Sequence, residues 1–215
     1  MIYKITYTAI LLLLVSIAYA QDDETDNREK LQFGARVGIS NSNVYDSEGE
    51  EFDTDAKFGL TGGAFIMIPI GKYLGVQPEV LITQKGFQGS GRLLGSNYDL
   101  KRTTTFFEIH VLVAFKPSEF ITVLLGPQYS YLLKQKDEFT SSLTSYSQER
   151  EFEQDDVRKN ILGIIGGLDI NLRHVVIGAR AGWDIQNNKG DGTSNTPRYK
   201  NVCLKFVVGY KLYKS

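Results

Sequence analysis

Glu108 and His110 are the residues of this chain whose types and spacing come closest to a catalytic arrangement. They lie two apart in the stretch FFEIHVLVAF, residues 106–115. Residues two apart on a strand share one face, so this carboxylate and this imidazole form a candidate general acid/base pair. The spacing places no nucleophile beside them, and the chain has only two histidines. A buried ion pair of purely structural role is the competing interpretation.

Other kinds of chemistry find less support in the sequence. One cysteine, Cys203, and two distant histidines lack the spacing of zinc ligands. The acidic stretch VYDSEGEEFDTD and the segment KGDGTSN offer oxygen ligands for calcium, but neither fits the twelve-residue calcium loop. GSGRLLGS, residues 89–96, has no strand-to-helix transition around it and so does not match a phosphate loop. The sequence therefore predicts no metal and no cofactor.

The charge balance does not imply a strongly electrostatic partner. The chain has 24 Lys and Arg against 25 Asp and Glu, for a net charge of −1. Because no basic stripe is visible along the chain, a nucleic-acid partner is not expected. A single cysteine also excludes an intramolecular disulfide, so the fold must be held by burial or by closure of a sheet.

The first twenty residues have the pattern of a secretory signal peptide. Lys4 is followed by the apolar run AILLLLVSIA and by the small-x-small site Ala18-Tyr19-Ala20. Cleavage there leaves an acidic leader at 21–30, expected to be periplasmic, and a single domain at 31–215. Because Lys4 is the only charge removed, the mature chain has 23 basic and 25 acidic residues, a net charge of −2.

The mature chain has hydrophobicity of period two almost throughout, which predicts strands. Eight are expected, each ten or more residues long, a length that suits a tilted strand crossing a bilayer. They span residues 31–41, 57–70, 74–87, 104–116, 120–134, 160–172, 174–186 and 201–213.

The connections between these strands alternate in length. Tight turns are expected at 71–73, 117–119 and around 173, and long polar loops at 42–56, 88–103, 135–159 and 187–200. Short connections on one side, long ones on the other and an even strand count are typical of outer-membrane barrels. The sequence therefore predicts an all-β fold, an eight-stranded antiparallel transmembrane β-barrel of up-and-down topology.

The two faces of the strands differ in a way that assigns the inside. One face is apolar on nearly every strand, as in the series Phe107, Ile109, Val111, Val113 and Phe115. The other face is polar and also holds most of the strand glycines, which leave room for other groups. Because the lumen of an eight-stranded barrel is just wide enough for side chains to fill, the crowded polar face is predicted to lie inside and the apolar face against lipid.

Nine polar residues are predicted to form a network in this lumen. They are Arg36, Glu79, Lys85, Glu108, His110, Asp169, Arg180, Asp184 and Lys205. Because their charges nearly balance, a buried network of ion pairs and hydrogen bonds is the simpler interpretation. We therefore predict a structural role for Glu108 and His110 and no catalytic residue.

Several stretches resemble the PorT-like family of small outer-membrane β-barrels. They are GARVGISNSN, FIMIPIGKYLGVQPEVLITQKG, FFEIHVLVAFK, LLGPQYSYLL, GIIGGLDI and KFVVGYKLY, of which QPEVLITQKG is the most specific. The resemblance covers residues 31–213 and implies an outer-membrane location; a few members of the family are linked to protein secretion. Two features depart from the family: His110 replaces a frequent proline, and the chain ends on Tyr213-Lys214-Ser215 rather than on an aromatic residue.

The expected function is that of a monomeric, non-enzymatic barrel in the outer membrane of a Gram-negative-type bacterium. Its long loops would be extracellular and its termini periplasmic. Besides outer-membrane lipid, a protein partner is expected through loops 42–56 and 135–159, in binding or in envelope assembly and secretion. An enzyme acting on lipid or peptide at Glu108 and His110 is the alternative, and a narrow pore is a weaker one.

Overall fold

A computed structural model describes residues 26–45, 54–93, 96–141, 145–150, 157–189 and 198–212. The predicted signal peptide and residues 21–25 of the leader lie outside these ranges. The strands are β1 (Gln32–Tyr45), β2 (Asp55–Pro69), β3 (Leu74–Leu93), β4 (Ser96–Phe115), β5 (Ile121–Ser141), β6 (Ser145–Arg150), β7 (Asn160–Leu172), β8 (Val175–Asp184) and β9 (Lys200–Leu212). No helix among the described residues is long and apolar enough to cross a membrane.

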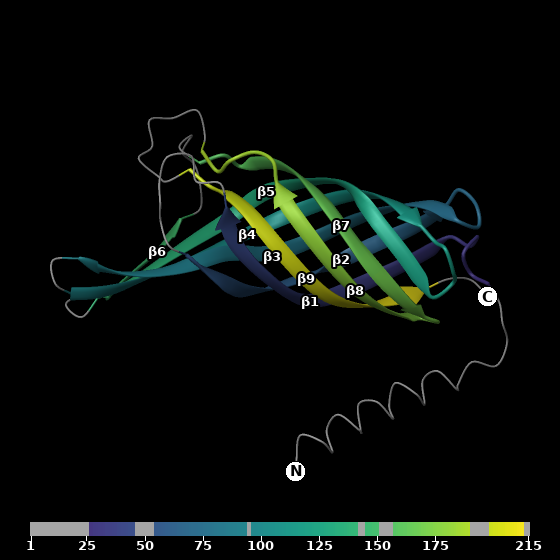
Figure 1. Ribbon diagram of the computed structural model, residues 1–215, viewed down its shortest axis with the longest axis horizontal. Coiled ribbons are helices and arrows are strands. Elements are labelled where there is room, and N and C mark those ends of the chain that lie inside the picture. The colour runs from purple at the N-terminus through teal and green to yellow at the C-terminus, as the bar shows by residue number, and fades with distance from the viewer. Residues whose placement is uncertain are drawn as a thin grey trace, which may run out of the picture.

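Eight of these strands close into an antiparallel barrel, which confirms the predicted fold (Figure 1). Strands that follow one another along the chain are neighbours in the ring, except that β7 takes the place next to β5 and that β1 pairs with β9. β4 pairs with β5 from Phe115↔Val123 onward, and β1 pairs with β9 from Phe33↔Leu212 onward. The first and last strands are thus hydrogen-bonded to each other, and the barrel has no free edge in its wall.

The short connections lie at one end of the barrel, as predicted. Ile70 and Gly71 both donate backbone hydrogen bonds to the carbonyl of Leu74, which closes the turn between β2 and β3. Arg173 joins β7 to β8 with a positive φ of 53°, a left-handed conformation that such a tight reversal requires. We call this the turn end of the barrel, and the opposite end the loop end.

At the loop end the structure corrects two predicted loops. The segment 88–103 is almost entirely strand, because β3 runs to Leu93 and β4 begins at Ser96. The segment 135–159 holds the end of β5 and an additional strand, β6, whose residues pair with β5 from Gln135↔Arg150 to Thr140↔Ser145. The ends of the predicted loop 42–56 also belong to strands β1 and β2.

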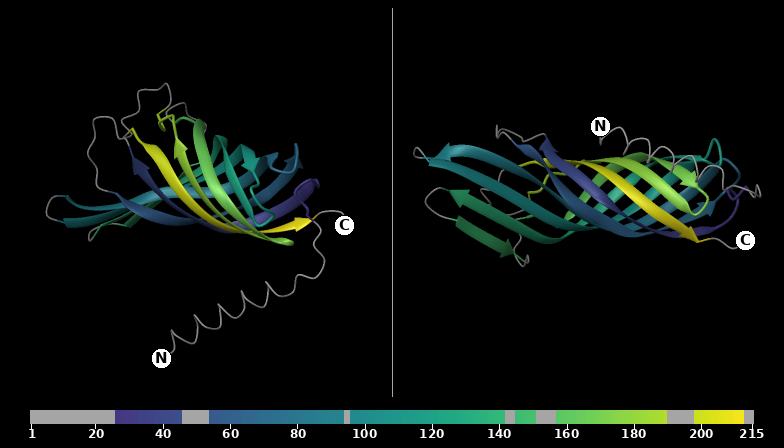
Figure 2. Two further views of the ribbon diagram at one scale, coloured as in Figure 1. Left: turned by 45° about the vertical axis from the view of Figure 1, so that its right-hand side comes forward. Right: turned by 90° about the horizontal axis from the view of Figure 1, so that it is seen from below.

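The loop-end parts of β3, β4 and β5, together with β6, form a sheet that projects past the barrel. In this order β3, β4, β5 and β6 stay hydrogen-bonded beyond the level at which the other strands end. Figure 2 shows the two hairpins extending together to one side of the loop end. β5 therefore pairs with β7 inside the barrel wall and with β6 above it. We call this four-stranded projection the extension.

The faces of the wall follow the predicted parity. Outward side chains are large and apolar, with Val37 69% exposed, and form the band that would meet lipid. Tyr73, Trp183 and Tyr210 are also exposed near strand ends, where interfacial aromatic residues are expected. The lumen is less uniformly polar than predicted, because it also encloses two apolar clusters: Met67, Leu112, Ala114, Leu124 and Ile165 in one, and Phe106, Leu132 and Ile161 in the other.

Two of the inward glycines leave room for long polar side chains. A β-carbon at Gly178 would lie 2.3 Å from Asp169 Oδ1, and one at Gly167 would lie 2.4 Å from Arg180 Cδ. Both distances are far below contact, so the ion pair between Asp169 and Arg180 needs glycine at these two positions. At Gly38, Gly63 and Gly126 an added β-carbon would instead lie 2.0 to 2.1 Å from a backbone carbonyl oxygen of a neighbouring strand, so glycine at these positions allows the close approach of strands rather than making room for the network.

Candidate functional site

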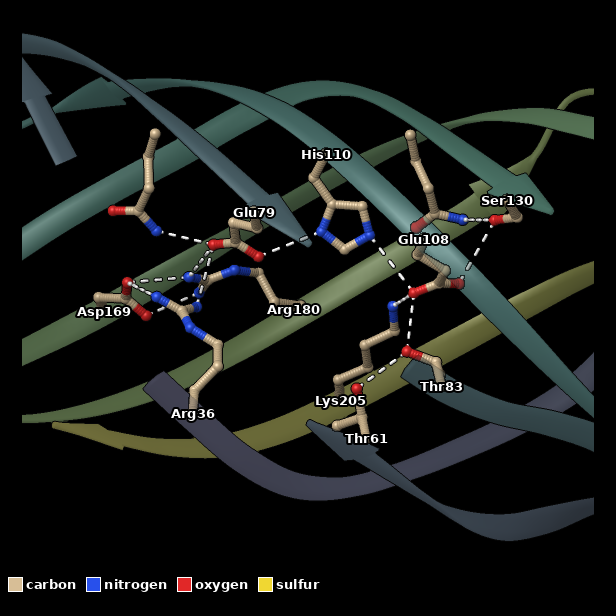
Figure 3. Close-up of polar contacts among 12 residues, drawn as sticks. Arg36, Thr61, Glu79, Thr83, Glu108, His110, Ser130, Asp169, Arg180 and Lys205 are labelled. Atoms are coloured by element: carbon tan, nitrogen blue, oxygen red, sulfur yellow. Dashed lines mark hydrogen bonds and ion pairs between the residues drawn. The ribbon is translucent and has the colours of Figure 1, made fainter. Parts of the chain in front are cut away.

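All nine predicted network residues point into the lumen and are buried. They come from β1, β3, β4, β7, β8 and β9, so the closed wall is what brings them together. Glu108 and His110 are both 0% exposed. The charged residues fall into two clusters along the axis, with His110 between them (Figure 3).

The first cluster, which we call the arginine cluster, consists of Arg36, Glu79, Asp169 and Arg180. Arg180 binds both carboxylate oxygens of Asp169 at 2.8 Å, and its Nη2 lies 3.5 Å from Glu79. Arg36 lies 3.0 Å from Glu79 and 3.6 Å from Asp169, as an ion pair without aligned hydrogen bonds. Its guanidinium also stacks 4.1 Å from the ring centre of Phe65. Each carboxylate therefore contacts both guanidinium groups.

The second cluster, the lysine cluster, consists of Lys85, Glu108, Asp184 and Lys205. Lys205 donates a short hydrogen bond to Glu108, and Lys85 Nζ lies 2.9 Å from the other oxygen of the same carboxylate. Asp184 is 3.3 Å from Lys85 and accepts a hydrogen bond of 2.7 Å from Asn201. Glu108 is thus the one carboxylate of this cluster that holds both ammonium groups.

Hydroxyl and amide groups complete the surroundings of Glu108. Thr83 donates to it at 2.8 Å and lies 2.9 Å from the hydroxyl of Thr61. Ser130 donates to the other carboxylate oxygen at 3.4 Å and accepts from Gln128 at 3.2 Å. A carboxylate that accepts from this many donors is held in one position.

His110 connects the two clusters. Its Nδ1 is hydrogen-bonded to Glu79 in the arginine cluster at 3.1 Å, and its Nε2 lies 3.4 Å from Glu108 in the lysine cluster, without an aligned hydrogen bond. The histidine that replaces the proline of the resembled family therefore has a defined place, between two carboxylates from neighbouring strands. The sequence placed this residue in the lumen but provided no signal for the bridge, which depends on the register Glu79↔His110.

Both ends of the lumen are covered by further side chains. At the turn end Arg28, from the leader, donates to the Lys116 carbonyl at 3.4 Å, and Lys116 donates back to the Arg28 carbonyl at 2.5 Å. At the loop end, Arg102 binds Asp137 at 2.7 and 2.8 Å and contacts the hydroxyl of Tyr199 at 3.4 Å. Parity alone cannot identify these contacts, because they join segments outside the regular wall.

Some participating residues were missed in the sequence. Thr61 was not assigned because the parity of its strand is ambiguous from the sequence, and Asn201 because it lies at a predicted strand start. Both side chains point into the lumen. Gly63 and Cys203, each two residues further along the same strand, lie on the same face. A fixed register of β2 against β1, Arg36↔Gly63, resolves the ambiguity.

The arrangement provides charge neutralisation and rigidity rather than an open reaction site. Two acidic and two basic groups meet in each cluster, and none of these groups is accessible at the surface. Among the residues that the structure describes, no three His, Cys, Asp or Glu are arranged to hold a metal ion. The central parts of the two calcium candidates, 46–53 and 190–195, lie outside the described residues.

Residues 19–189 match the family model described as the outer membrane protein beta-barrel domain. The chain belongs to this family. Membership places it in the outer membrane of Gram-negative bacteria, with the barrel as its membrane-embedded part.

Similar solved structures are small outer-membrane barrels. The attachment invasion locus protein Ail of Yersinia pestis has 19% identity and a TM-score of 0.45, covering 85% of this chain and 99% of that one. Neisserial surface protein A has 12% identity and a TM-score of 0.44, covering 85% and 97%. OprG of Pseudomonas aeruginosa has 11% identity and a TM-score of 0.42, covering 89% and 100%. No curated protein matches the chain.

Proposed function

We propose that this protein is a non-enzymatic outer-membrane barrel that acts through its loop end, as a binding module or an accessory of envelope assembly and secretion. The loop end would face outward from the cell and both termini the periplasm, and the chain would belong to the PorT-like branch of its family. The observation that carries the proposal is the difference between the two ends. One has three tight turns, and the other carries a four-stranded extension.

The extension has the properties of a preformed contact surface. Its strands continue from the barrel wall and are paired with one another, as in Lys101↔Glu138 and Phe87↔Arg102. The β4–β5 pairing shifts by one residue between Thr105 and Phe106, where the extension leaves the wall. The ion pair of Arg102 with Asp137 joins β4 to β5 at its base, and the Phe87 ring packs edge-on against Tyr199 at 5.3 Å. A surface held this way loses little conformational freedom when a partner binds.

Burial supports the non-enzymatic interpretation over an enzyme that uses Glu108 and His110. A catalytic acid or base must lie within hydrogen-bond reach of its substrate. Both residues are 0% exposed, and their polar atoms face other network residues. We expect His110→Ala to lower heat stability and to leave the envelope phenotype of cells unchanged. Lost lipid or peptide turnover in purified protein with unchanged stability would support the enzyme instead.

The filled lumen also supports a binding role over a pore. The arginine and lysine clusters lie between the apolar cluster at the turn end and the apolar cluster at the loop end. The side chains of all four clusters are buried. We expect no conductance above background in planar bilayers. Sustained channel openings from the wild-type barrel would overturn this part of the proposal.

The extension offers a direct test because its strands can be shortened in register. Replacing residues 138–147 by Asn-Gly joins the register partners Asp137 and Gln148 through a two-residue turn and keeps the pair of Arg102 with Asp137. Replacing residues 90–99 by Asn-Gly joins Gly89 to Leu100 in the same way and is the matched control.

The measurement is in-cell photo-crosslinking from position 101, which both shortened variants retain, followed by identification of the crosslinked species by mass spectrometry. We expect the wild type to yield a discrete partner, which shortening of the β5–β6 hairpin removes and shortening of the β3–β4 hairpin weakens less. Unchanged crosslinking in a double-shortened variant that still shows folded-form gel mobility would sink the proposal.

A further inference from the structure

β6 is the strand that stands at an edge of the described sheet along its whole length. The order of the sheet ends with β6, which pairs with β5 from Gln135↔Arg150 to Thr140↔Ser145. Within the residues that the structure describes, no strand pairs with its other side. We call this side of β6 the open edge. A strand edge presents a row of N–H and C=O groups that can pair with another chain.

The pairing of the extension shows which residues address the open edge. In an antiparallel sheet the N–H and C=O of one residue point to the same neighbouring strand, and successive residues alternate. The Arg102 carbonyl points to β3, because a β-carbon added at Gly86 would lie 2.0 Å from it. Lys101 therefore points to β5, and its partner Glu138 to β4. Continued through β5 into β6, the alternation turns every second residue of β6 to the open edge. These are Ser145, Ser147 and Glu149.

The open edge lacks the features with which proteins commonly protect such edges. Proline, lysine and β-bulges are the usual ones. β6 has the sequence SYSQER, without proline or lysine, and its six pairs with β5 have no register shift. On the opposite side of the extension, β2 pairs with β3 only up to Gln88, and residues 89–93 have the sequence GSGRL. Because two glycines weaken that strand, β6 is the better of the two edges for pairing.

The charge of the loop end indicates the kind of chain that would pair there. The segments 42–56, 88–103, 135–159 and 187–200 have 15 Asp and Glu against 10 Lys and Arg, a net charge of −5. This count includes every cation of the loop end, whatever it contacts within the protein. A net charge of this sign attracts a basic chain and repels an acidic one.

We propose that the open edge of β6 receives an extended, basic segment of a partner protein as a fifth strand of the extension. Main-chain hydrogen bonds to Ser145, Ser147 and Glu149 would supply the affinity, and the charge of the loop end would select a basic segment. This inference rests on the proposed binding role of the loop end and specifies how the partner is held.

The first test asks whether the open edge is accessible in the isolated protein. Amide hydrogen exchange of the full mature barrel in detergent micelles is measured residue by residue by NMR. We expect Ser145, Ser147 and Glu149 to exchange roughly tenfold faster than the other three residues of β6, whose N–H groups bond to β5. Equal protection of both sets would mean that another part of the chain covers the edge, which overturns the proposal.

The second test removes one main-chain group of the open edge. Ser147→Pro deletes an N–H there and replaces it with a proline ring, which edge strands tolerate. Ser147→Ala is the matched control, because it changes the same side chain and keeps the N–H. Folded-form gel mobility verifies that each variant is folded.

The measurement is in-cell photo-crosslinking from position 140, followed by mass spectrometry of the crosslinked peptide. Thr140 is exposed on β5, so a strand added to β6 would lie two strand spacings away, about 10 Å. We expect the wild type and Ser147→Ala to capture the same segment, rich in Lys and Arg. Ser147→Pro should capture it roughly tenfold less, because it loses a hydrogen bond and adds a clash.

The other outcomes separate this inference from the proposed function. Equal capture by all three proteins, or capture from position 101 but not from 140, would leave the proposed function intact and overturn pairing at the open edge. A captured segment without basic residues, or one from a second copy of this chain, would overturn the assigned occupant. No capture from either position would remove the proposed function and this inference with it.

Discussion

The two charged clusters of the lumen contain the same number of charges but connect them differently. In the arginine cluster each carboxylate contacts both guanidinium groups, so the four side chains form a closed ring. In the lysine cluster Glu108 holds both ammonium groups, and Asp184 reaches Lys85 alone. Loss of one carboxylate of the ring leaves each arginine a second carboxylate. Loss of Glu108, which we call the hub, leaves Lys85 with Asp184 alone and Lys205 with no carboxylate of its cluster.

The chemistry of the cations accounts for the difference. A guanidinium is a planar fork with five donors, so one arginine can serve two carboxylates at once. An ammonium is a compact charge, and two of them fit around one carboxylate. The clusters meet at Arg180↔Lys205, a pair of like charges in register on adjacent strands. Such a pair is unfavourable, and here the two side chains turn to different carboxylates.

Removal of the hub should therefore have the largest effect. We expect Glu108→Ala to lower the free energy of unfolding by about 3 to 5 kcal/mol, because Lys85 and Lys205 lose the carboxylate that they share. Thermal loss of folded-form gel mobility measures the change. Glu138→Ala, at an exposed ion pair of the extension, is the control and should cost far less, because solvent screens such a pair. Equal effects of the two substitutions would remove the distinction between hub and surface.

Loss of one corner of the ring should be milder. Asp169→Asn keeps one hydrogen-bond acceptor for Arg180, and Glu79 still contacts both arginines. We expect a loss of about 2 kcal/mol, in the range for hydrogen bonds to charged groups. The same melting assay applies, and a loss as large as that of Glu108→Ala would show that the ring has no redundancy.

Crowding of the ring tests its dependence on glycine. Gly178→Ala would place a β-carbon 2.3 Å from Asp169 Oδ1, so the carboxylate must move off Arg180. We expect a loss of about 1.5 kcal/mol, within the range for overpacking. Gly182→Ala is matched on the same strand, with its closest neighbour 3.1 Å away at Gln128 Oε1, and should cost less. A reversed order in the melting assay would contradict the assigned role of Gly178.

The bridge through His110 should couple the ring to the hub. Asp169→Asn and Asp184→Asn act in different clusters, and independent sites add within about 0.5 kcal/mol. We expect the double variant to deviate from additivity by about 0.5 to 1 kcal/mol, and this coupling to disappear when His110→Ala is present in all four proteins. Additivity in the wild-type background would mean that the clusters are independent.

The exposed ion pair between Arg28 and Asp26 in the leader should have the smallest effect of the charged contacts compared here. Hydrogen bonds from Arg28 hold the pKa of Asp26 well below its usual range. A depressed pKa means that the stabilisation is present at neutral pH and is lost only as pH falls through that low pKa. The backbone amides of residues 26–31 should therefore be as protected from hydrogen exchange at about pH 4.5 as at neutral pH. Asp26→Asn should lower this protection at both pH values. Loss of protection near the ordinary Asp pKa would refute this pairing.

Much of the wall could be predicted because period-two hydrophobicity and turn spacing depend only on local sequence. Phe107, Ile109 and Val111 alternate with Glu108 and His110, and that alone assigned both faces of β4. Contacts between strands needed register, so the bridge from Glu79 through His110 to Glu108 could not be derived. The extension was missed for another reason: segments such as QGSGRLLGSN show no alternation of polar and apolar residues, so the pattern predicted loops there.

The pairing of β1 with β9 has a consequence for how the chain reaches its final state. β3 and β4 form a long hairpin between sequence neighbours, and such local contacts form with little loss of chain entropy. The seam between β1 and β9 joins residues at opposite ends of the chain and must wait until the last strand is available. A nascent or truncated chain that lacks β9 would expose the edges of β1 and β8. Such a chain would be a substrate for chaperones or proteases before it is a membrane protein.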